Sequence, residues 1–141
     1  MKKEFILLIL CFLAFVAPSF ACDCDGEVPL KESLAKSPKV FLGKVISIKG
    51  YKTLVKPKYD WQQYYVIEFK PKEVYKGKKS DTIMLIAESS DCGGEFMEGS
   101  SYLVFTFWNE KEKKLEYHQC FRMALPEQYA AKDIAKIKSK N

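Results

Sequence analysis

The sequence has little of the chemistry that most enzymes and nucleic-acid-binding proteins need. Among its 141 residues there is one arginine, Arg122, and one histidine, His118. A single arginine supplies almost none of the bidentate donors that recognise phosphate, so the formal net charge of +5 indicates a solvated surface. With one histidine, a hydrolytic triad or a catalytic metal centre has few residues to draw on. We therefore expect neither an enzyme nor a nucleic-acid-binding protein, and no cofactor.

Long apolar runs are missing beyond the first 20 residues. The apolar run at 5–17 follows two lysines and is too short to span a bilayer comfortably. Small residues at the two ends of 19–21 suit a signal peptidase, so residues 1–21 are expected to be a signal peptide. The mature chain, 22–141, has the size of one domain. We expect it to be a soluble monomer that is secreted to the extracellular space, or to the periplasm if the host is bacterial.

The cysteines of the mature chain indicate disulfides. Four remain after cleavage, namely Cys22, Cys24, Cys92 and Cys120. An even number in an exported domain is typical of a disulfide framework, and four cysteines allow three pairings. A bond between Cys22 and Cys24 would close a tiny strained ring, which leaves two pairings. One alternative is a lipid on Cys22, which would attach the chain to a membrane and exclude that sulfur from a disulfide. Another is a zinc cluster completed by His118.

Cleavage after residue 21 makes Cys22 the first residue of the mature protein. In an extended segment Cys22 and Cys24 point to one face and Asp23 to the other. If both sulfurs are bonded to the body of the protein, the α-amino group, the first carbonyl and Asp23 are held rigidly at the surface. The sequence therefore predicts that the N-terminal edge is a fixed structure.

The rest of the pattern predicts a mainly β domain. Five strands are expected, at Val40–Lys49, Tyr64–Tyr75, Thr82–Ala87, Tyr102–Trp108 and Leu115–Phe121. We expect a short helix at Glu27–Ser37 and a closing helix from Pro126 to Lys138. Gly43 indicates a bulge or bend in the first strand, and Pro71 interrupts the second. Five strands with a bent first strand fit a small antiparallel barrel of the oligonucleotide/oligosaccharide-binding (OB) type.

Two connections between these strands stand out. The hairpin at Gly50–Gln62 breaks the strand pattern with glycine, proline and several lysines, yet it carries Tyr51, Tyr59 and Trp61. An aromatic and lysine-rich tip of this kind is a candidate contact surface. The polar connection at Glu88–Ser101 contains Cys92 followed by two glycines, which permit backbone angles closed to other residues.

Six segments, taken in chain order, carry a resemblance. They are Cys22-x-Cys24, Val40-Phe41-Leu42-Gly43-Lys44-Val45, Val74-Tyr75-Lys76-Gly77, Ser89-Ser90-Asp91-Cys92-Gly93, Tyr102-Leu103-Val104 and Cys120. Their order, and the order and spacing of the four cysteines, resemble the N-terminal domain of the tissue inhibitors of metalloproteinases, a netrin-like module. The resemblance covers nearly the whole mature chain.

The resemblance implies an OB-type barrel in which Cys22 is bonded to Cys92 and Cys24 to Cys120. It also implies inhibition of zinc endopeptidases by a wedge made of the N-terminal strand and the loop bonded to it. The residues of this wedge would be Cys22, Asp23, Cys24, Ser89, Ser90, Asp91, Cys92 and Gly93. The protein would supply no metal site of its own, because the amine and carbonyl of Cys22 would chelate the catalytic zinc of the target.

The resemblance also leaves an alternative open, because netrin-like modules occur in proteins that inhibit nothing. In that case the protein is an extracellular module that binds another protein or a polysaccharide. The hairpin residues Tyr51, Tyr59 and Trp61 are then the expected contact.

Overall fold

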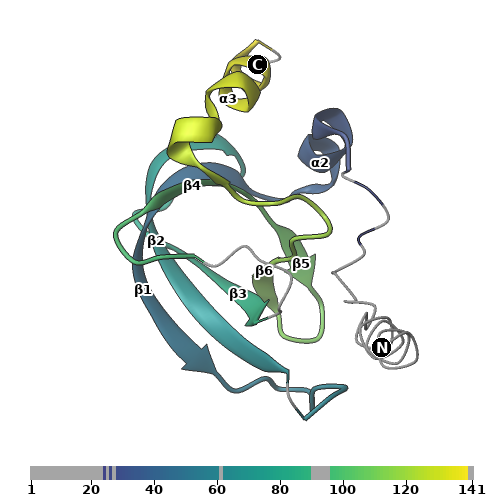
Figure 1. The fold of residues 1–141 in the computed structure, drawn as a ribbon. Coiled ribbons are helices and arrows are strands. Elements are labelled where there is room, and N and C mark those ends of the chain that lie inside the picture. Colours follow the sequence, from purple (N-terminus) through teal and green to yellow (C-terminus); the bar gives the residue numbers. More distant parts are fainter. Residues whose placement is uncertain (1–23, 25, 27, 61, 90–95, 140–141) are drawn as a thin grey trace, which may run out of the picture.

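A curled β-sheet forms most of the molecule, as Figure 1 shows for the computed structural model, which describes residues 24, 26, 28–60, 62–89 and 96–139. Its seven strands are ordered β5-β6-β3-β2-β1-β4-β7. The strands are β1 (Val40–Tyr51), β2 (Gln63–Lys76), β3 (Ile83–Ser89), β4 (Ser101–Phe105), β5 (Phe107–Asn109), β6 (Lys114–Tyr117) and β7 (Leu125–Pro126). All neighbouring strands are antiparallel except β3 and β6, which are parallel. The expectation of a mainly β domain is therefore confirmed.

Two helices and a short 3-10 turn complete the described part of the chain. They are α2 (Leu30–Lys36), η1 (Glu127–Tyr129) and α3 (Ala131–Lys138). Both helices occur where helices were expected, but α3 begins later than Pro126. That proline has an extended backbone and pairs with Tyr102 as part of β7, so the helix starts only after η1. Neither helix has the length and apolarity needed to cross a bilayer.

The long strands β1 and β2 bend because their pairing shifts register. They pair from Val40 opposite Lys76 to Tyr51 opposite Tyr64, and one shift lies between Leu42 and Gly43. A Cβ atom on Gly43 would lie 3.0 Å from the Phe41 ring, so glycine permits a close approach there. The predicted irregularity at Gly43 is confirmed. Pro71, opposite Gly43, lies within β2 and does not end it, because the bulge removes the need for its missing N–H.

The sheet has seven strands where the sequence predicted five, and one reason is a break at Thr106. The expected strand Tyr102–Trp108 is divided into β4 and β5 at this residue. Thr106 is fully buried, and its amide and its hydroxyl both donate to the carbonyl oxygen of Lys39, at 3.1 and 2.9 Å. Because of these two hydrogen bonds, the pairing of β4 with β1 ends at Phe105. The two-residue strand β7 adds the other extra strand.

The last predicted strand is also shorter than expected. Instead of reaching Phe121 it ends at Tyr117, where β6 ends. The carbonyl oxygen of His118 accepts hydrogen bonds from the amides of Phe121, at 3.0 Å, and Arg122, at 3.4 Å. These bonds fold the next residues into a turn. Cys120 therefore lies in a turn and not in a strand.

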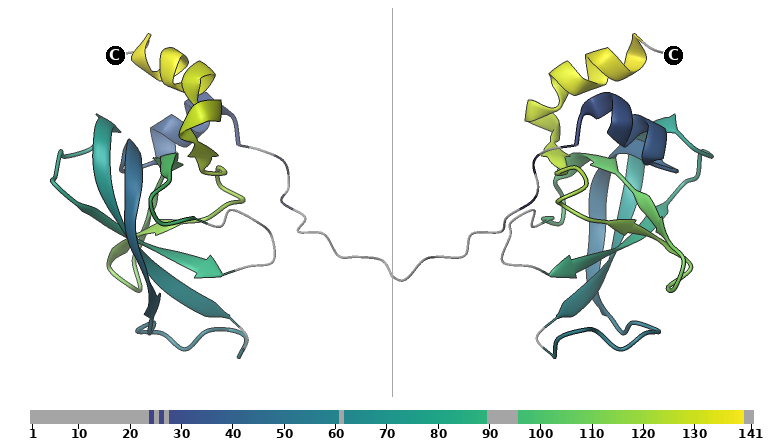
Figure 2. Two further views of the ribbon diagram at one scale, coloured as in Figure 1. Left: turned by 60° about the vertical axis from the view of Figure 1, so that its left-hand side comes forward. Right: turned by 90° about the vertical axis from the view of Figure 1, so that its right-hand side faces the viewer.

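Alternation along the strands creates two apolar clusters, one on each face of the sheet. On β1, Phe41 faces the inside of the curl, whereas Val40 and Leu42 face the helices. The inner cluster contains Phe41, Val45, Ile67, Phe69, Ile83, Leu85, Ala87, Phe96, Tyr102, Val104, Tyr117 and Ala124. The outer cluster joins Val40, Leu42, Leu103 and Phe105 to Ala130 and Ile137. Figure 2 shows α2 and α3 together at one end of the sheet, and the hairpin that joins β1 to β2 lies at the opposite end.

Candidate functional site

The first described residues are attached to the body of the protein at two points. A disulfide joins Cys24 to Cys120, with 5.1 Å between their Cα atoms and 96 positions between them in sequence. Four residues after Cys24, the carbonyl oxygen of Val28 accepts a hydrogen bond of 2.9 Å from Nη1 of Arg122. Cys24 and Val28 are therefore both attached to the turn that follows β6.

His118 helps to shape this turn. Its Nδ1 accepts a hydrogen bond of 3.2 Å from the amide of Cys120. Its ring is exposed and lies 6.4 Å, centroid to centroid, from the ring of Phe107. His118 therefore has a structural part in positioning Cys120.

Arg122 is a buried clamp. Its side chain is 7% exposed, its Nη2 lies 2.5 Å from Oδ2 of Asp133 on α3, and its guanidinium lies 5.1 Å from the centroid of the Phe105 ring. It therefore ties the N-terminal segment to the last helix. The sequence predicted that a lone arginine is a poor anion site, but it contained no signal for this contact with Val28, which lies 94 positions away.

The loop of the expected wedge begins at the same edge of the sheet. Ala87 on β3 is the parallel partner of Tyr117 on β6, so the carboxyl ends of the two strands lie side by side. Ser89 follows two residues after Ala87, and Cys120 follows three residues after Tyr117. The structure therefore places the carboxyl end of β3 next to that of β6, and the turn after β6 carries Cys120 and then Arg122, which contacts Asp133 on α3.

The far end of this loop is held by the core. The Phe96 ring lies 4.9 Å from the Tyr117 ring and 5.1 Å from the Tyr102 ring, in edge-to-face geometry. Both flanks of the loop are thus anchored beside the turn of Cys120. The other predicted wedge residues, which are Cys22, Asp23, Ser90, Asp91, Cys92 and Gly93, lie outside the described residues, as does the expected bond between Cys22 and Cys92.

The β1–β2 hairpin lies next to Ser89. Gln63, the first residue of β2, pairs with Ser89, and Nε2 of Gln62 donates to Oε1 of Glu88 at 2.8 Å. The predicted hairpin is confirmed, and its loop exposes Leu54, Val55 and Tyr59. Tyr51 lies at its base, at the end of β1, whereas Trp61 lies outside the described residues.

One carboxylate holds the hairpin loop in place. Glu112, in the turn between β5 and β6, accepts hydrogen bonds from the Tyr51 hydroxyl at 3.0 Å and from the amides of Leu54, at 2.9 Å, and Val55, at 3.2 Å. Burial alone would raise the pKa of Glu112, but these hydrogen bonds, with the charge of Lys114, outweigh it and lower the pKa from its usual value. In the sequence, nothing distinguishes Glu112 from the charged residues beside it.

Glu116 on β6 is a second buried carboxylate. Burial raises its pKa, and its main partner is Asn109, whose Nδ2 donates to Oε2. The same Asn109 accepts the amide of Glu112 through Oδ1, at 3.0 Å. These contacts fix the β5–β6 turn. Among the residues that the structure describes, no three potential metal ligands are grouped in a way that could hold an ion.

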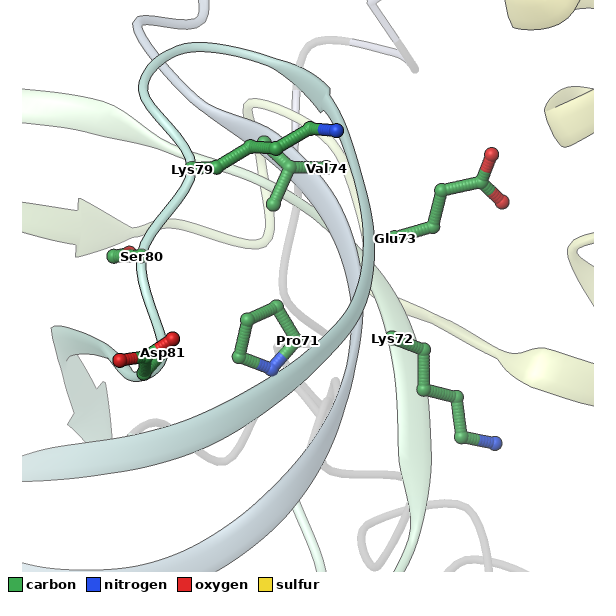
Figure 3. A pocket seen from close by; sticks show the side chains of 7 residues that line it. All are labelled: Pro71, Lys72, Glu73, Val74, Lys79, Ser80 and Asp81. Atoms are coloured by element: carbon green, nitrogen blue, oxygen red, sulfur yellow. The ribbon is translucent and has the colours of Figure 1, made fainter.

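Residues that the structure describes line at least two surface pockets. The larger, of about 540 Å³, lies at the base of the hairpin and is lined by Gly50, Tyr51, Lys52, Thr53, Pro57, Gln62, Gln63, Tyr64 and Tyr65. The other, of about 460 Å³, lies inside the β2–β3 turn (Figure 3). Figure 3 shows Pro71 and Val74 within this turn, whereas Lys72 and Glu73 point away, where they pair with Glu127 and Lys138.

Comparison of the whole sequence with known proteins gave no relative: no family model matches the chain, and no curated protein matches it.

Proposed function

We propose that the protein is a secreted inhibitor of a zinc metalloendopeptidase. Residues 1–21 are the signal peptide, and Cys22 is the first residue of the mature chain. The observation that carries the proposal is the double attachment of the N-terminal segment, through the Cys24–Cys120 disulfide and the Arg122–Val28 hydrogen bond. An end held in this way loses little conformational entropy on binding.

The chemistry of inhibition is chelation. A catalytic zinc ion keeps one coordination position open for water, and an amine nitrogen with the adjacent carbonyl oxygen can occupy it. The α-amine of Cys22 must lose its proton first, and such groups titrate at about pH 7.7 to 8.0, so binding near neutrality is feasible. The inhibitor needs no metal of its own.

The wedge is completed by the bond from Cys22 to Cys92. Support comes from the parallel pairing of Ala87 with Tyr117, because the loop that contains Cys92 follows β3 and the turn that contains Cys120 follows β6. Asp23 points into the pocket beyond the scissile position, with Ser90 and Asp91 beside it. Burying a carboxylate costs several kcal/mol unless a cation meets it, so the target is an enzyme whose pocket carries a positive charge.

The fold that accompanies this function is an OB-type barrel, and the support is the strand order. β1 pairs with both β2 and β4, β3 pairs with β6, and β5 continues β4 after Thr106 alone. When β4 and β5 are counted as one interrupted strand, the order β1-β2-β3-β6-β5/β4 returns to β1. Five strands then enclose the inner cluster, and β7 is a short addition.

The deciding experiment extends the mature chain by one alanine before Cys22. The extension moves the α-amine away from the metal, so inhibition of a sensitive zinc endopeptidase should weaken by about a hundredfold or more. The inhibition constant is measured for both forms, and N-terminal sequencing establishes where each begins. The matched control carries its extra alanine after Asn141 and should inhibit normally. Equal potency of the N-terminally extended protein and the unextended one would refute chelation.

A second candidate function is binding through the hairpin without inhibition. It is favoured by the exposure of Leu54, Val55 and Tyr59 in a loop that Glu112 holds in one conformation. In that case the N-terminal extension changes nothing, whereas alterations of the hairpin abolish binding.

A further inference from the structure

The pocket at the base of the hairpin has the size of a ligand site. Its volume, about 540 Å³, lies within the range of roughly 300 to 1,000 Å³ that is typical of small-molecule pockets. Tyr65 from β2 supplies an aromatic ring on the same face as Gly50, whereas Tyr51 and Tyr64 pair with each other and lie on the opposite face of the two strands. Gln63 and Thr53 supply amide and hydroxyl groups.

Gly50 keeps the pocket open. It pairs directly with Tyr65 across β1 and β2, so a side chain at position 50 would lie on the same face as the Tyr65 ring. A Cβ atom built on Gly50 meets no other atom within 4 Å. The space beside Tyr65 is therefore free, and it is free because residue 50 has no side chain.

Contacts from two other elements fix the shape of the pocket. Glu112 holds Tyr51 and the amides of Leu54 and Val55. On the other side, Gln62 donates to Glu88 at the end of β3. The walls are therefore positioned before a ligand arrives, which reduces the entropy lost on binding.

The charge around the pocket is positive. Residues 49–60 contain four lysines, Lys49, Lys52, Lys56 and Lys58, against one acidic residue, Asp60. The carboxylates of Glu88, Glu112 and Glu116 interact with Tyr64, on the face of the strands opposite to Gly50 and Tyr65.

We propose that this pocket binds an acidic sugar unit of a polysaccharide. The Tyr65 ring offers a flat apolar face to the sugar ring, the amide of Gln63 meets its hydroxyl groups, and Lys52 meets its carboxylate or sulfate. The pocket contains none of the residues proposed to inhibit a protease, so this proposal can be true or false independently of the inhibitor proposal. It narrows the second candidate function to one class of ligand.

The first test compares three probes by isothermal titration calorimetry with the full mature chain: a sulfated hexasaccharide, an unsulfated hexasaccharide of uronic acids and a neutral hexaglucose. Binding of either acidic probe at least about tenfold tighter than the neutral one is expected. The stronger of the two acidic probes identifies sulfate or carboxylate as the recognised group. Equal affinity for all three probes, or no binding of any, would overturn the proposal.

The second test fills the pocket. The backbone at Gly50 is ordinary β-strand, since its φ is not positive, so Gly50→Leu should fold and should lower affinity for the acidic probe by about tenfold or more. Gly50→Ala should have a smaller effect. Thermal unfolding of each variant verifies the fold. Undiminished binding by Gly50→Leu would exclude the pocket as the site.

A matched pair of charge variants separates recognition from general attraction. Lys52→Gln, in the pocket, should weaken binding by about two- to fivefold. Lys70→Gln, on the exposed part of β2 outside the pocket, should leave it unchanged. If both variants lose the same affinity, the protein attracts polyanions through its net charge alone and the proposal fails. Inhibition of a zinc endopeptidase by Gly50→Leu should stay normal, which keeps the two proposals distinguishable.

Discussion

At the scale of single residues, two buried charges fix the segments that carry the candidate sites. Glu112 joins its turn to amides 57 and 58 positions away, and Arg122 reaches the carbonyl of Val28 across 94 positions. A buried charge stabilises a fold only where hydrogen bonds replace its lost hydration, and both residues meet that condition. The cysteines could be recognised from the sequence because their chemistry is unusual. Glu112 and Arg122 could not, because their partners are backbone atoms that only the fold brings near.

Removal of the Glu112 carboxylate should loosen the hairpin. In Glu112→Ala the amides of Leu54 and Val55 and the Tyr51 hydroxyl lose their acceptor, so the free energy of unfolding should fall by about 1–2 kcal/mol. Urea denaturation measures the fall, and hydrogen exchange at Leu54 and Val55 should accelerate more than exchange in β1. Glu110→Ala, which removes an exposed carboxylate from the same turn, is the control and should leave the midpoint where it is. A Glu112 variant as stable as this control would contradict the clamp.

The lowered pKa of Glu112 gives this effect a pH dependence. Because the pKa is lower in the folded state than the usual 4.5, the stabilisation is fully present above pH 4.5 and is lost as the pH falls below that value. The difference in unfolding free energy between the wild type and Glu112→Ala should therefore be largest near neutral pH and shrink toward pH 3. A difference that grew on acidification would show that the carboxylate is not the stabilising form.

At the scale of the elements, local pattern predicted most strands but not how they end or pair. The β-branched runs of β1 and β3 were sufficient to locate them, and Gly43 was sufficient to predict a bend. The break at Thr106 was not predictable, because its cause is the carbonyl of Lys39, 67 positions away. The parallel pairing of β3 with β6 was missed as well, and it is this pairing that places the carboxyl end of β3 next to that of β6.

The β2–β3 turn offers a test of how closely elements approach one another. Gly77 has a φ of +89°, and a Cβ atom on it would lie 2.7 Å from the carbonyl oxygen of Pro38, just before β1. Gly99 has a φ of +83° but no atom within 4 Å of such a Cβ. Gly99→Ala should therefore cost about 1–2 kcal/mol for the left-handed backbone alone, and Gly77→Ala should cost more. Urea denaturation of the two variants compares the costs, and equal losses would show that the approach to Pro38 is relaxed without penalty.

At the scale of the whole molecule, the barrel-like sheet links the segments that carry the candidate sites. The turn of Cys120, the end of β3 and the hairpin come from distant parts of the chain, yet consecutive pairings connect Tyr117 to Ala87 and Ser89 to Gln63. The sequence predicted the binding segments separately, from cysteine spacing and aromatic content. Their adjacency depends on the curl of the sheet, which no local pattern specifies.

The Cys24–Cys120 disulfide should contribute much of the stability of this arrangement. Replacing both cysteines by serine removes a crosslink between residues that are 96 positions apart. The unfolded chain then gains conformational entropy, so the free energy of unfolding should fall by about 2–5 kcal/mol. Urea denaturation measures the fall, and hydrogen exchange should show that the amide of Arg122 opens with the turn while the amides of β1 stay protected. Cys22→Ser is the matched control, because it leaves the bond from Cys24 to Cys120 intact: a non-reduced digest of that variant should still contain a peptide joining residues 24 and 120. If that peptide is missing, or if the double variant unfolds at the wild-type urea concentration, the first attachment of the N-terminal segment is wrong, and the inhibitor proposal loses the observation that carries it.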